Sequence, residues 1–509
     1  MADISANNKR IAKNTLVLYV RMFIMMAISL YTSRVVLKIL GVEDFGIYNV
    51  VGGIVSMMGM INGAMSVSTT RYLTFELGKG DMVRLKQTFR MCVNIYGLLA
   101  LILLILSETI GLWFLNTQLV IPDDRMVAAN WLFQFSILSA IFSLLTNPYN
   151  AVIISREKMS IYAYISLADA VLKLAIVYLL LFIPFDKLIV YGFLLMLLII
   201  LNTSIYFIYC NRKYQESRYS FYWETTLFKQ LLSYTGWNLF GSASALVKGQ
   251  GLNILLNMFF NPSVNAARGI AYQVNTTVNQ FFTNFYTAVR PQITKYYAQQ
   301  DLDNMFKLVF RSSKMAFFLI LLISLPLIIE APYVIQLWLG QLPEFVVPFM
   351  RLILVITAVD AMANPLMTTA HATGKIALYQ SVVGTMTILN IPISYLFLHY
   401  GSGPVIVFEV SLIIAIVNII LRLCILKRLV GFPVLAYIKK VFLNCLSVTI
   451  ISAMLPILAY RFVTDGIIGV IIVCTLAILS TIATAYYIGL EKSERSFVTE
   501  FIGKKLKRR

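Results

Sequence analysis

Stretches of about 20 mostly apolar residues follow one another along almost the whole chain, and an α-helix of that length crosses a bilayer core. With 59% hydrophobic and 13% charged residues, the chain also lacks the usual balance of a soluble domain. The pattern therefore predicts an all-α integral membrane protein with about 14 transmembrane helices. The apolar runs are residues 15–39, 45–67, 89–107, 126–146, 161–183, 188–209, 227–260, 266–289, 316–335, 345–370, 376–398, 405–426, 441–460 and 466–488.

Lys and Arg gather in every second loop between these runs, and cytoplasmic loops are the ones that collect basic residues. If the N-terminus is cytoplasmic, most of the 42 basic residues fall on the cytoplasmic side. An even number of spans then places both termini in the cytoplasm. The basic tail, 504–509, is expected to contact anionic lipid headgroups. The net charge of +19 thus follows a membrane face, so no nucleic-acid partner is expected.

Several classes of chemistry have no counterpart in the sequence. It contains no G-x-x-x-x-G-K-[ST] motif for nucleotide phosphates, so we expect no use of ATP. Paired carboxylates and Ser/His/Asp or Cys/His sets on a soluble platform are absent, so we predict no enzyme and no catalytic residues. His371 and His399 have no Cys, Asp or Glu at metal-ligand spacing, so neither a metal nor a cofactor is expected.

The first six runs recur as runs seven to twelve. Each copy contains six crossings, so both copies begin on the same side of the membrane and the repeat is parallel. This predicts an N-terminal six-helix lobe over 1–211, a C-terminal six-helix lobe over 227–428, and an extra helix pair with a basic cytoplasmic tail over 429–509. The matched positions, at offsets between 217 and 223, include Asn147-Pro148 with Asn364-Pro365, Lys158 with Lys375, and Asp81 with Asp301.

The segment after the first run reads Leu40-Gly41-Val42-Glu43-Asp44-Phe45-Gly46-Ile47-Tyr48. Together with the repeat, the number of runs and the basic loop after the second run, it resembles the polysaccharide-flippase branch of the multidrug/oligosaccharidyl-lipid/polysaccharide exporter superfamily. Over most of the chain the sequence is most similar to Wzx-type flippases. This resemblance implies a V-shaped central cleft and the export of undecaprenyl-diphosphate-linked oligosaccharide repeat units across the bacterial inner membrane by alternating access.

The same resemblance implies a role in lipopolysaccharide O-antigen or capsule biosynthesis. The expected partners are the polyprenyl-diphosphate-linked oligosaccharide, membrane lipids and a polysaccharide polymerase. Three alternatives remain: a MATE-type cation-coupled drug antiporter, a MurJ-like lipid II flippase, and a membrane scaffold or polymerase subunit without transport.

Basic residues inside the runs are the candidates for substrate binding. Each costs roughly 2.5–3.5 kcal/mol at the centre of a span, so it normally faces a protein interior or a water-filled cavity. Basic residues outnumber acidic ones within the runs, which favours an anionic cargo. We predict that a cationic cleft binds the diphosphate through Arg21, Arg34, Lys248 and Arg268.

The acidic residues inside the runs differ in their local setting. Asp169 and Lys173 are four residues apart, so we expect them to pair on one helix face. Asp360 has no cation three or four positions away, which makes it the candidate for ion coupling or for pairing with a basic residue of the other lobe. The amide-rich runs 227–260 and 266–289 supply hydrogen-bonding groups either to a cavity or to helix packing.

Overall fold

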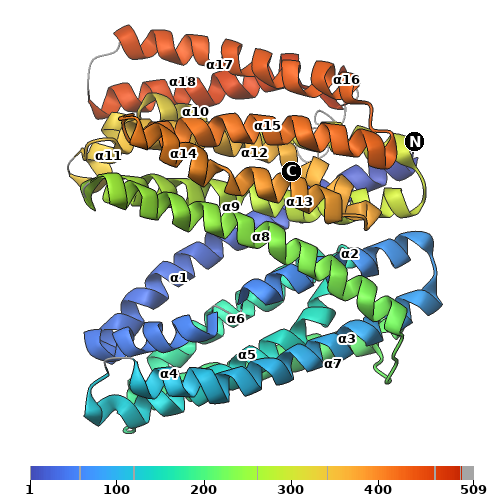
Figure 1. Cartoon of the computed structure of the whole chain (residues 1–509), viewed down its shortest axis with the longest axis vertical. Helices are drawn as coiled ribbons and strands as arrows, with labels where there is room; N and C mark the ends of the chain where they lie inside the picture. The colour runs from blue at the N-terminus through green and yellow to red at the C-terminus, as the bar shows by residue number, and fades with distance from the viewer. Residues whose placement is uncertain are drawn as a thin grey trace, which may run out of the picture. The chain divides into compact units, whose positions relative to one another are not determined.

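The structure is a computed structural model that describes residues 2–56, 59–118, 121–260, 262–340, 342–462, 466–492 and 494–495. Throughout these ranges the chain forms helices joined by short turns, with no strand (Figure 1). Eleven helical segments in them are long and apolar enough to cross a membrane. The chain is therefore a multi-pass, all-α membrane protein, as the sequence predicts. The basic tail, 504–509, lies outside the described residues.

The helices group into two compact units. Unit 1 comprises Met1–Ser242 and Thr294–Gln300, and unit 2 comprises Ala243–Ile293 and Asp301–Arg509. Two long helices, α8 (Thr225–Phe259) and α9 (Pro262–Ala298), contribute residues to both units. The lobe boundaries drawn from the sequence and the central cleft stay predictions.

Unit 1 is built from the helices of the first half of the chain. Inside it, α5 packs against α3 and α7, and α1 packs against α6. Its buried apolar core includes Phe133, Tyr96 and Leu115. The helices are α1 (Ala2–Ser56), α2 (Gly59–Lys79), α3 (Met82–Leu106), α4 (Leu112–Thr117), α5 (Met126–Ser155), α6 (Met159–Leu179) and α7 (Lys187–Lys213).

Unit 2 contains the remaining helices. Its last long helices, α17 and α18, lie side by side and pack against α10 (Figure 1). Lys314 on α10 is only 2% exposed and bonds to Glu494 at 2.9 Å, which ties the segment after α18 to the unit. The helices are α10 (Leu302–Ile329), α11 (Ala331–Leu339), α12 (Val346–Thr373), α13 (Ala377–Ile388), α14 (Asn390–His399), α15 (Ile406–Val430), α16 (Val434–Tyr437), α17 (Leu443–Phe462) and α18 (Ile467–Thr484).

The first two apolar runs of the sequence are not separate helices. Helix α1 continues to Ser56 and changes direction at Gly41, whose backbone (φ 81°, ψ 171°) is not helical. Glycine adopts this positive φ without the steric cost that a Cβ brings. The predicted span 45–67 is thus shared between the end of α1 and the start of α2.

The repeated sequence pairs have the same local role in both units. Asp81 and Asp301 cap the N-termini of α3 and α10 by accepting a backbone N–H bond, at 2.8 Å and 3.2 Å. Asn147 and Asn364, each followed by proline, donate their side-chain amides to the carbonyl four residues earlier.

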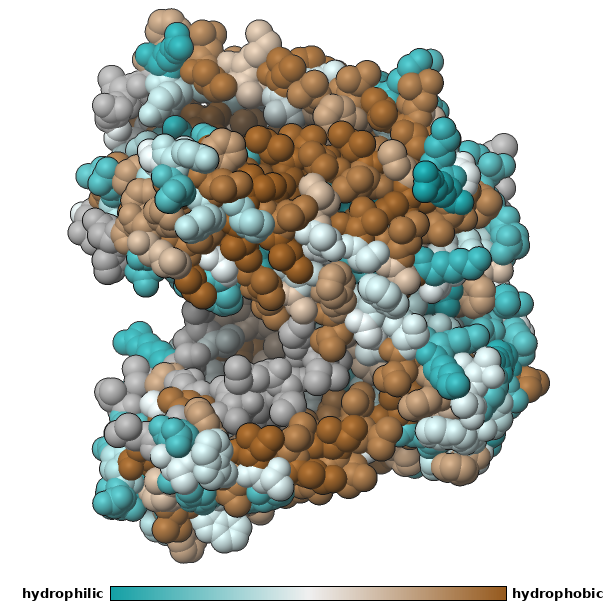
Figure 2. All heavy atoms as spheres, viewed as in Figure 1, coloured by the Kyte–Doolittle hydropathy of each residue, from teal (hydrophilic) through white to brown (hydrophobic). Residues whose placement is uncertain are grey.

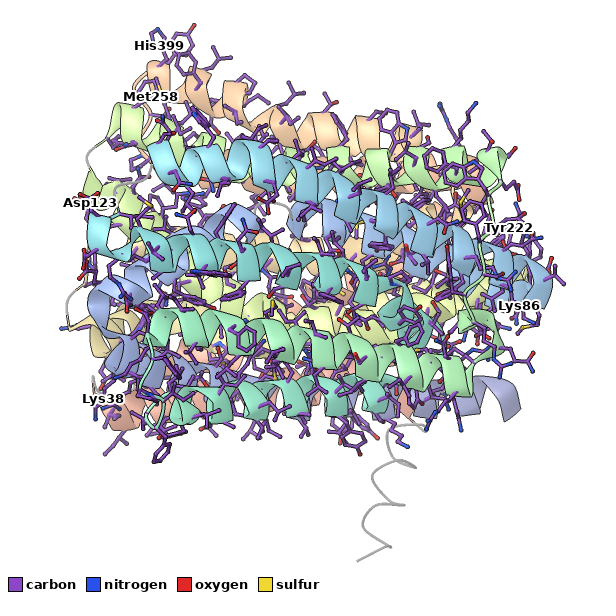
Figure 3. The ribbon with its side chains drawn as sticks, turned by 90° about the horizontal axis from the view of Figure 1, so that it is seen from below. Lys38, Lys86, Asp123, Tyr222, Met258 and His399 are labelled. Atoms are coloured by element: carbon purple, nitrogen blue, oxygen red, sulfur yellow. The ribbon has the colours of Figure 1, made fainter. Side chains whose placement is uncertain are left out.

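Large apolar side chains cover the outward faces of the helices, as a protein in lipid requires. Examples are Ile450 and Met454 on α17 and Leu479 on α18, all exposed, and Figure 2 shows such apolar surface in brown. Within unit 1, Lys38 and Asp123 lie at one end of the helices and Lys86 and Tyr222 at the opposite end (Figure 3). Charged and interfacial residues thus mark the two ends of an apolar band.

Candidate functional site

Unit 1 contains a half-open cavity of about 250 Å³ between α1, α6 and α7. Its walls combine apolar, aromatic, hydroxyl and charged side chains, the composition of a small-molecule pocket. The lining residues are Met25, Ile28, Ser29, Thr32, Val36, Phe45, Tyr48, Asp169, Ala170, Lys173 and Tyr191.

An ion pair forms the charged part of this cavity. The ammonium of Lys173 lies 2.8 Å from one carboxylate oxygen of Asp169, one turn earlier on α6. The other carboxylate oxygen accepts a hydrogen bond of 2.6 Å from the side-chain amide of Asn202 on α7. The helical spacing of four residues brings the pair together, so the prediction of an Asp169–Lys173 pair is confirmed. Asn202 was not predicted.

Aromatic rings form another part of the wall. Tyr48 and Tyr191 pack with ring centroids 5.2 Å apart, and Phe45 lies 6.5 Å from Tyr48. Phe45 and Tyr48 come from the part of α1 after the bend at Gly41, so that bend brings the glycine-containing motif to the cavity. The hydroxyl of Thr32, also in the lining, has no hydrogen-bond partner among the residues that the structure describes.

In unit 2 the acidic residue Asp360 has a different environment. It is exposed on α12, and in the part of the chain that the structure describes its carboxylate forms no ion pair or hydrogen bond. Lys248 on α8 and Arg422 on α15 are the cations that interact with it electrostatically. Both belong to the same unit as Asp360 and not to the other one. The Nε atom of Arg422 is buried, and no residue in the described part of the chain forms a hydrogen bond with it.

The four basic residues predicted to bind substrate divide between the units. Arg21 and Arg34 lie in unit 1, and Lys248 and Arg268 lie in unit 2. Arg21 donates from Nε to the hydroxyl of Ser166 and lies over the ring of Tyr162, at 4.5 Å, so it joins α1 to α6. Arg34 is exposed and bonds to no other residue in the described ranges.

Arg268 joins α8 to α9. It donates to the carbonyl of Gly249 at 2.6 Å and to Asn253 at 3.2 Å, and it lies 4.4 Å from the ring centroid of Tyr272. These contacts use much of its hydrogen-bonding capacity for helix packing. Lys248, the residue before Gly249, is half-buried and interacts with Asp360. Substrate binding by the four basic residues stays a prediction.

Sequence reasoning missed Arg422 and the aromatic residues of the cavity. Arg422 lies in an apolar run, and basic residues inside spans normally face an interior, so its position was a usable signal. The sequence contains no signal that Tyr48 and Tyr191 line a cavity. Aromatic residues occur in many membrane helices, and only the packing of the helices decides which of them face a cavity.

Comparisons with known proteins identify the fold. The MatE family model matches residues 18–179, about a third of the chain. No curated protein sequence matches the chain. Among solved structures, a multidrug resistance MATE family transporter in an outward-facing conformation is 13% identical, with a TM-score of 0.71 over 84% of this chain and 97% of that one.

Two further solved structures agree with this result. A MATE protein in the straight conformation is 13% identical, with a TM-score of 0.70 over 83% of this chain and 97% of that one. A MOP superfamily transporter from Pyrococcus furiosus is also 13% identical, with a TM-score of 0.69 over 83% and 96% of the two chains. For that protein, reverse polarity of the binding pocket suggests a different function.

These findings correct the predicted function. The assignment to Wzx-type flippases is wrong, because both the matching family model and the similar structures are those of MATE proteins. Three predictions that depended on this assignment are wrong as well: the lipid-linked oligosaccharide cargo, the polymerase partner, and the role in O-antigen or capsule biosynthesis. The resemblance rested on the segment Leu40–Tyr48, the repeat, the number of apolar runs and the basic loop after the second run. These features indicate the fold and not the cargo. The protein has the fold of MATE transporters.

Proposed function

We propose that the chain is a secondary transporter of the MATE type that exports small molecules in exchange for protons or sodium ions. The shared fold and the matching family model support this proposal. Since the sequence has no nucleotide-binding motif, export would draw on an ion gradient or on the membrane potential. One cation that crosses 100 mV releases about 2.3 kcal/mol.

The observation that carries the coupling step is the open carboxylate of Asp360. Among the residues that the structure describes, no hydrogen bond or ion pair occupies this carboxylate, whereas Asp169 is bonded to both Lys173 and Asn202. A carboxylate that is exposed and without direct partners can take up and release a proton or a sodium ion. We therefore place coupling at Asp360, with Lys248 and Arg422 as the cations that respond to its change of charge.

We assign substrate binding to the cavity of unit 1. Its apolar and aromatic walls suit the body of a small amphipathic molecule, and its charged pair and hydroxyls suit a polar group. Alternating access would expose this cavity first to one side of the membrane and then to the other. Arg34 and Lys248 remain candidates for further substrate contacts, because fewer bonds hold them than hold Arg21 and Arg268.

We place the protein in the bacterial inner membrane with both termini in the cytoplasm. The concentration of basic residues in alternate loops supports this orientation. Lys86 and Tyr222, which belong to the predicted cytoplasmic loops, lie at the same end of unit 1 (Figure 3).

The experiment is gradient-driven transport in proteoliposomes that contain the purified full-length protein. A panel of cationic, neutral and anionic fluorescent compounds is supplied, and an opposing proton or sodium gradient is imposed. We expect at least one compound to move faster than in protein-free vesicles, and only while a gradient is present. If folded protein moves no compound in the panel under either gradient, the proposal is wrong.

A further inference from the structure

We propose that the cavity of unit 1 binds small amphipathic molecules through a negatively charged group, and that Lys173 is its anion-binding residue. The inference rests on the proposed function in that it names the substrate class of the same cavity. It goes beyond the fold, because an exporter with this fold could equally bind a cation or a neutral compound.

The ion pair of Asp169 and Lys173 has more free hydrogen-bond donors than acceptors. Both oxygens of the Asp169 carboxylate are engaged, one by Lys173 at 2.8 Å and the other by Asn202 at 2.6 Å. A lysine ammonium has three N–H donors. In the described part of the chain, Asp169 is the one polar partner of Lys173. The pair therefore offers spare donors to a ligand and little spare acceptor capacity.

The two side chains of the ion pair are not equally accessible to a ligand. The side chain of Lys173 is 45% exposed, whereas that of Asp169 is 18% exposed. Both residues line the cavity, so an entering molecule meets the ammonium more readily than the carboxylate. The hydroxyl of Thr32, which has no partner within the described ranges, provides another donor in the same lining.

An organic cation is a poorer ligand for this ion pair than an anion. Such a cation would have to displace Lys173 from Asp169, but Lys173 is attached to the same helix and thus competes at a high effective concentration. The Tyr48 and Tyr191 rings could attract a cation through their faces. However, the neighbouring ammonium of Lys173 opposes that attraction. The rings are better used to pack the apolar body of an anion.

The volume of the cavity limits the size of its ligand. A cavity of about 250 Å³ accommodates a molecule of one or two fused rings. Met25, Ile28 and Val36 supply an apolar wall for such a body. The expected ligand is thus a compact aromatic or apolar molecule that carries one carboxylate or a similar anionic group.

The test is a binding measurement with two probes of the same shape and opposite charge, 2-naphthoate and 2-naphthyltrimethylammonium. Equilibrium dialysis with the full-length protein in nanodiscs gives each dissociation constant without any need for transport. We expect naphthoate to bind at least about tenfold more tightly than the ammonium probe, since a charge-assisted hydrogen bond contributes at least that factor.

Variants separate an anion-binding role from a structural one. Lys173→Gln should weaken naphthoate binding about tenfold or more, and Lys173→Arg should retain most of it. Asp169→Asn releases the ammonium and should leave naphthoate binding equal or stronger. The double variant Asp169→Asn/Lys173→Gln should lose naphthoate binding without leaving an unpaired charge. Lys187→Gln, an exposed lysine at the start of α7 outside the cavity lining, is the matched control and should bind as wild type does.

The inference is wrong if the ammonium probe binds more tightly, if neither probe binds, if Lys173→Gln binds naphthoate as wild type does, or if Asp169→Asn abolishes binding. Its failure is distinguishable from failure of the proposed function. Gradient-driven export of a cationic compound with no binding of naphthoate would overturn the inference alone. Binding of naphthoate without transport of any compound would overturn the proposed function alone.

Discussion

The ammonium of Lys173 lies 2.8 Å from the carboxylate of Asp169, so the acidic residue in the cavity of unit 1 is neutralised within its own helix. The acidic residue of unit 2 that we assign to coupling, Asp360, forms no such bond with any residue in the described ranges. The two carboxylates are therefore not equivalent. One is part of an ion pair in the lining of a pocket, and the other is the carboxylate at which we propose that a proton or a sodium ion exchanges.

A buried glutamate, Glu157, should hold the N-terminal part of α1 and the C-terminal end of α9 together in unit 1. Its side chain is 0% exposed and pairs with Arg10 at 2.7 Å and with Lys295. Glu157→Gln removes both ion pairs, and we expect a loss of about 1–3 kcal/mol, below the usual cost of breaking a buried pair because Arg10 can reach water. Thermal unfolding in detergent measures the change.

Lys158→Gln is the control for this variant, because Lys158 is adjacent and exposed. It should unfold within about 0.5 kcal/mol of wild type. Equal unfolding temperatures for Glu157→Gln and wild type would show that the Glu157 pairs contribute nothing to the fold.

Arg125 should be irreplaceable by lysine. Its guanidinium bonds to both oxygens of Asp44, at 2.8 Å and 2.6 Å, and to Asp186 at 2.6 Å. A lysine ammonium has no planar fork and cannot reproduce this arrangement. We expect Arg125→Lys to destabilise unit 1 by about 1–3 kcal/mol, measured by thermal unfolding. Asp124→Asn, next to it, is the control and should have no effect. If Arg125→Lys unfolds at the same temperature as wild type, the planar guanidinium of Arg125 makes no specific contribution to the stability of unit 1.

The ion pair between Arg84 and Glu224 gives a pH dependence with a defined sign. Hydrogen bonds from Arg84 and Tyr222 lower the pKa of Glu224 from 4.5 to about 2. Because the folded-state pKa is depressed, the stabilisation is complete above pH 4.5 and is lost as the pH falls towards 2. The difference in unfolding temperature between wild type and Arg84→Gln should be constant from pH 7 to 5 and then shrink. If wild type and Arg84→Gln already unfold at the same temperature at pH 5, the pKa of Glu224 is not depressed by this ion pair.

The sequence predicts those parts of the structure that depend on local spacing. Apolar runs indicate the helices, the spacing of four residues indicates the Asp169–Lys173 pair, and the repeated aspartates fall at helix starts, where they act as caps. The bend at Gly41 was less predictable. The apolar pattern stops and resumes around it, and the same interruption would mark a loop.

Contacts between distant helices were not predictable from the sequence. The pairing of Arg125 with Asp44 joins residues 81 positions apart, and that of Lys295 with Glu157 joins residues 138 positions apart. No periodicity within a helix encodes such a pair, because it depends on how the helices pack. The cargo was unpredictable for a related reason, since the same membrane fold can transport chemically different molecules.

The central claim is that Asp360 couples ion movement to export, and the most direct measurement compares Asp360→Asn with wild type in proteoliposomes. The substrate is a compound that wild type transports. A difference of one pH unit is worth about 1.4 kcal/mol, enough for about tenfold accumulation if one proton exchanges for each molecule. We predict that wild type and Glu409→Gln, an exposed acid of the same unit, reach this gradient-dependent accumulation. Asp360→Asn should bind substrate but accumulate none above the level without a gradient. Retention of the wild-type proton or sodium dependence by Asp360→Asn would contradict the account.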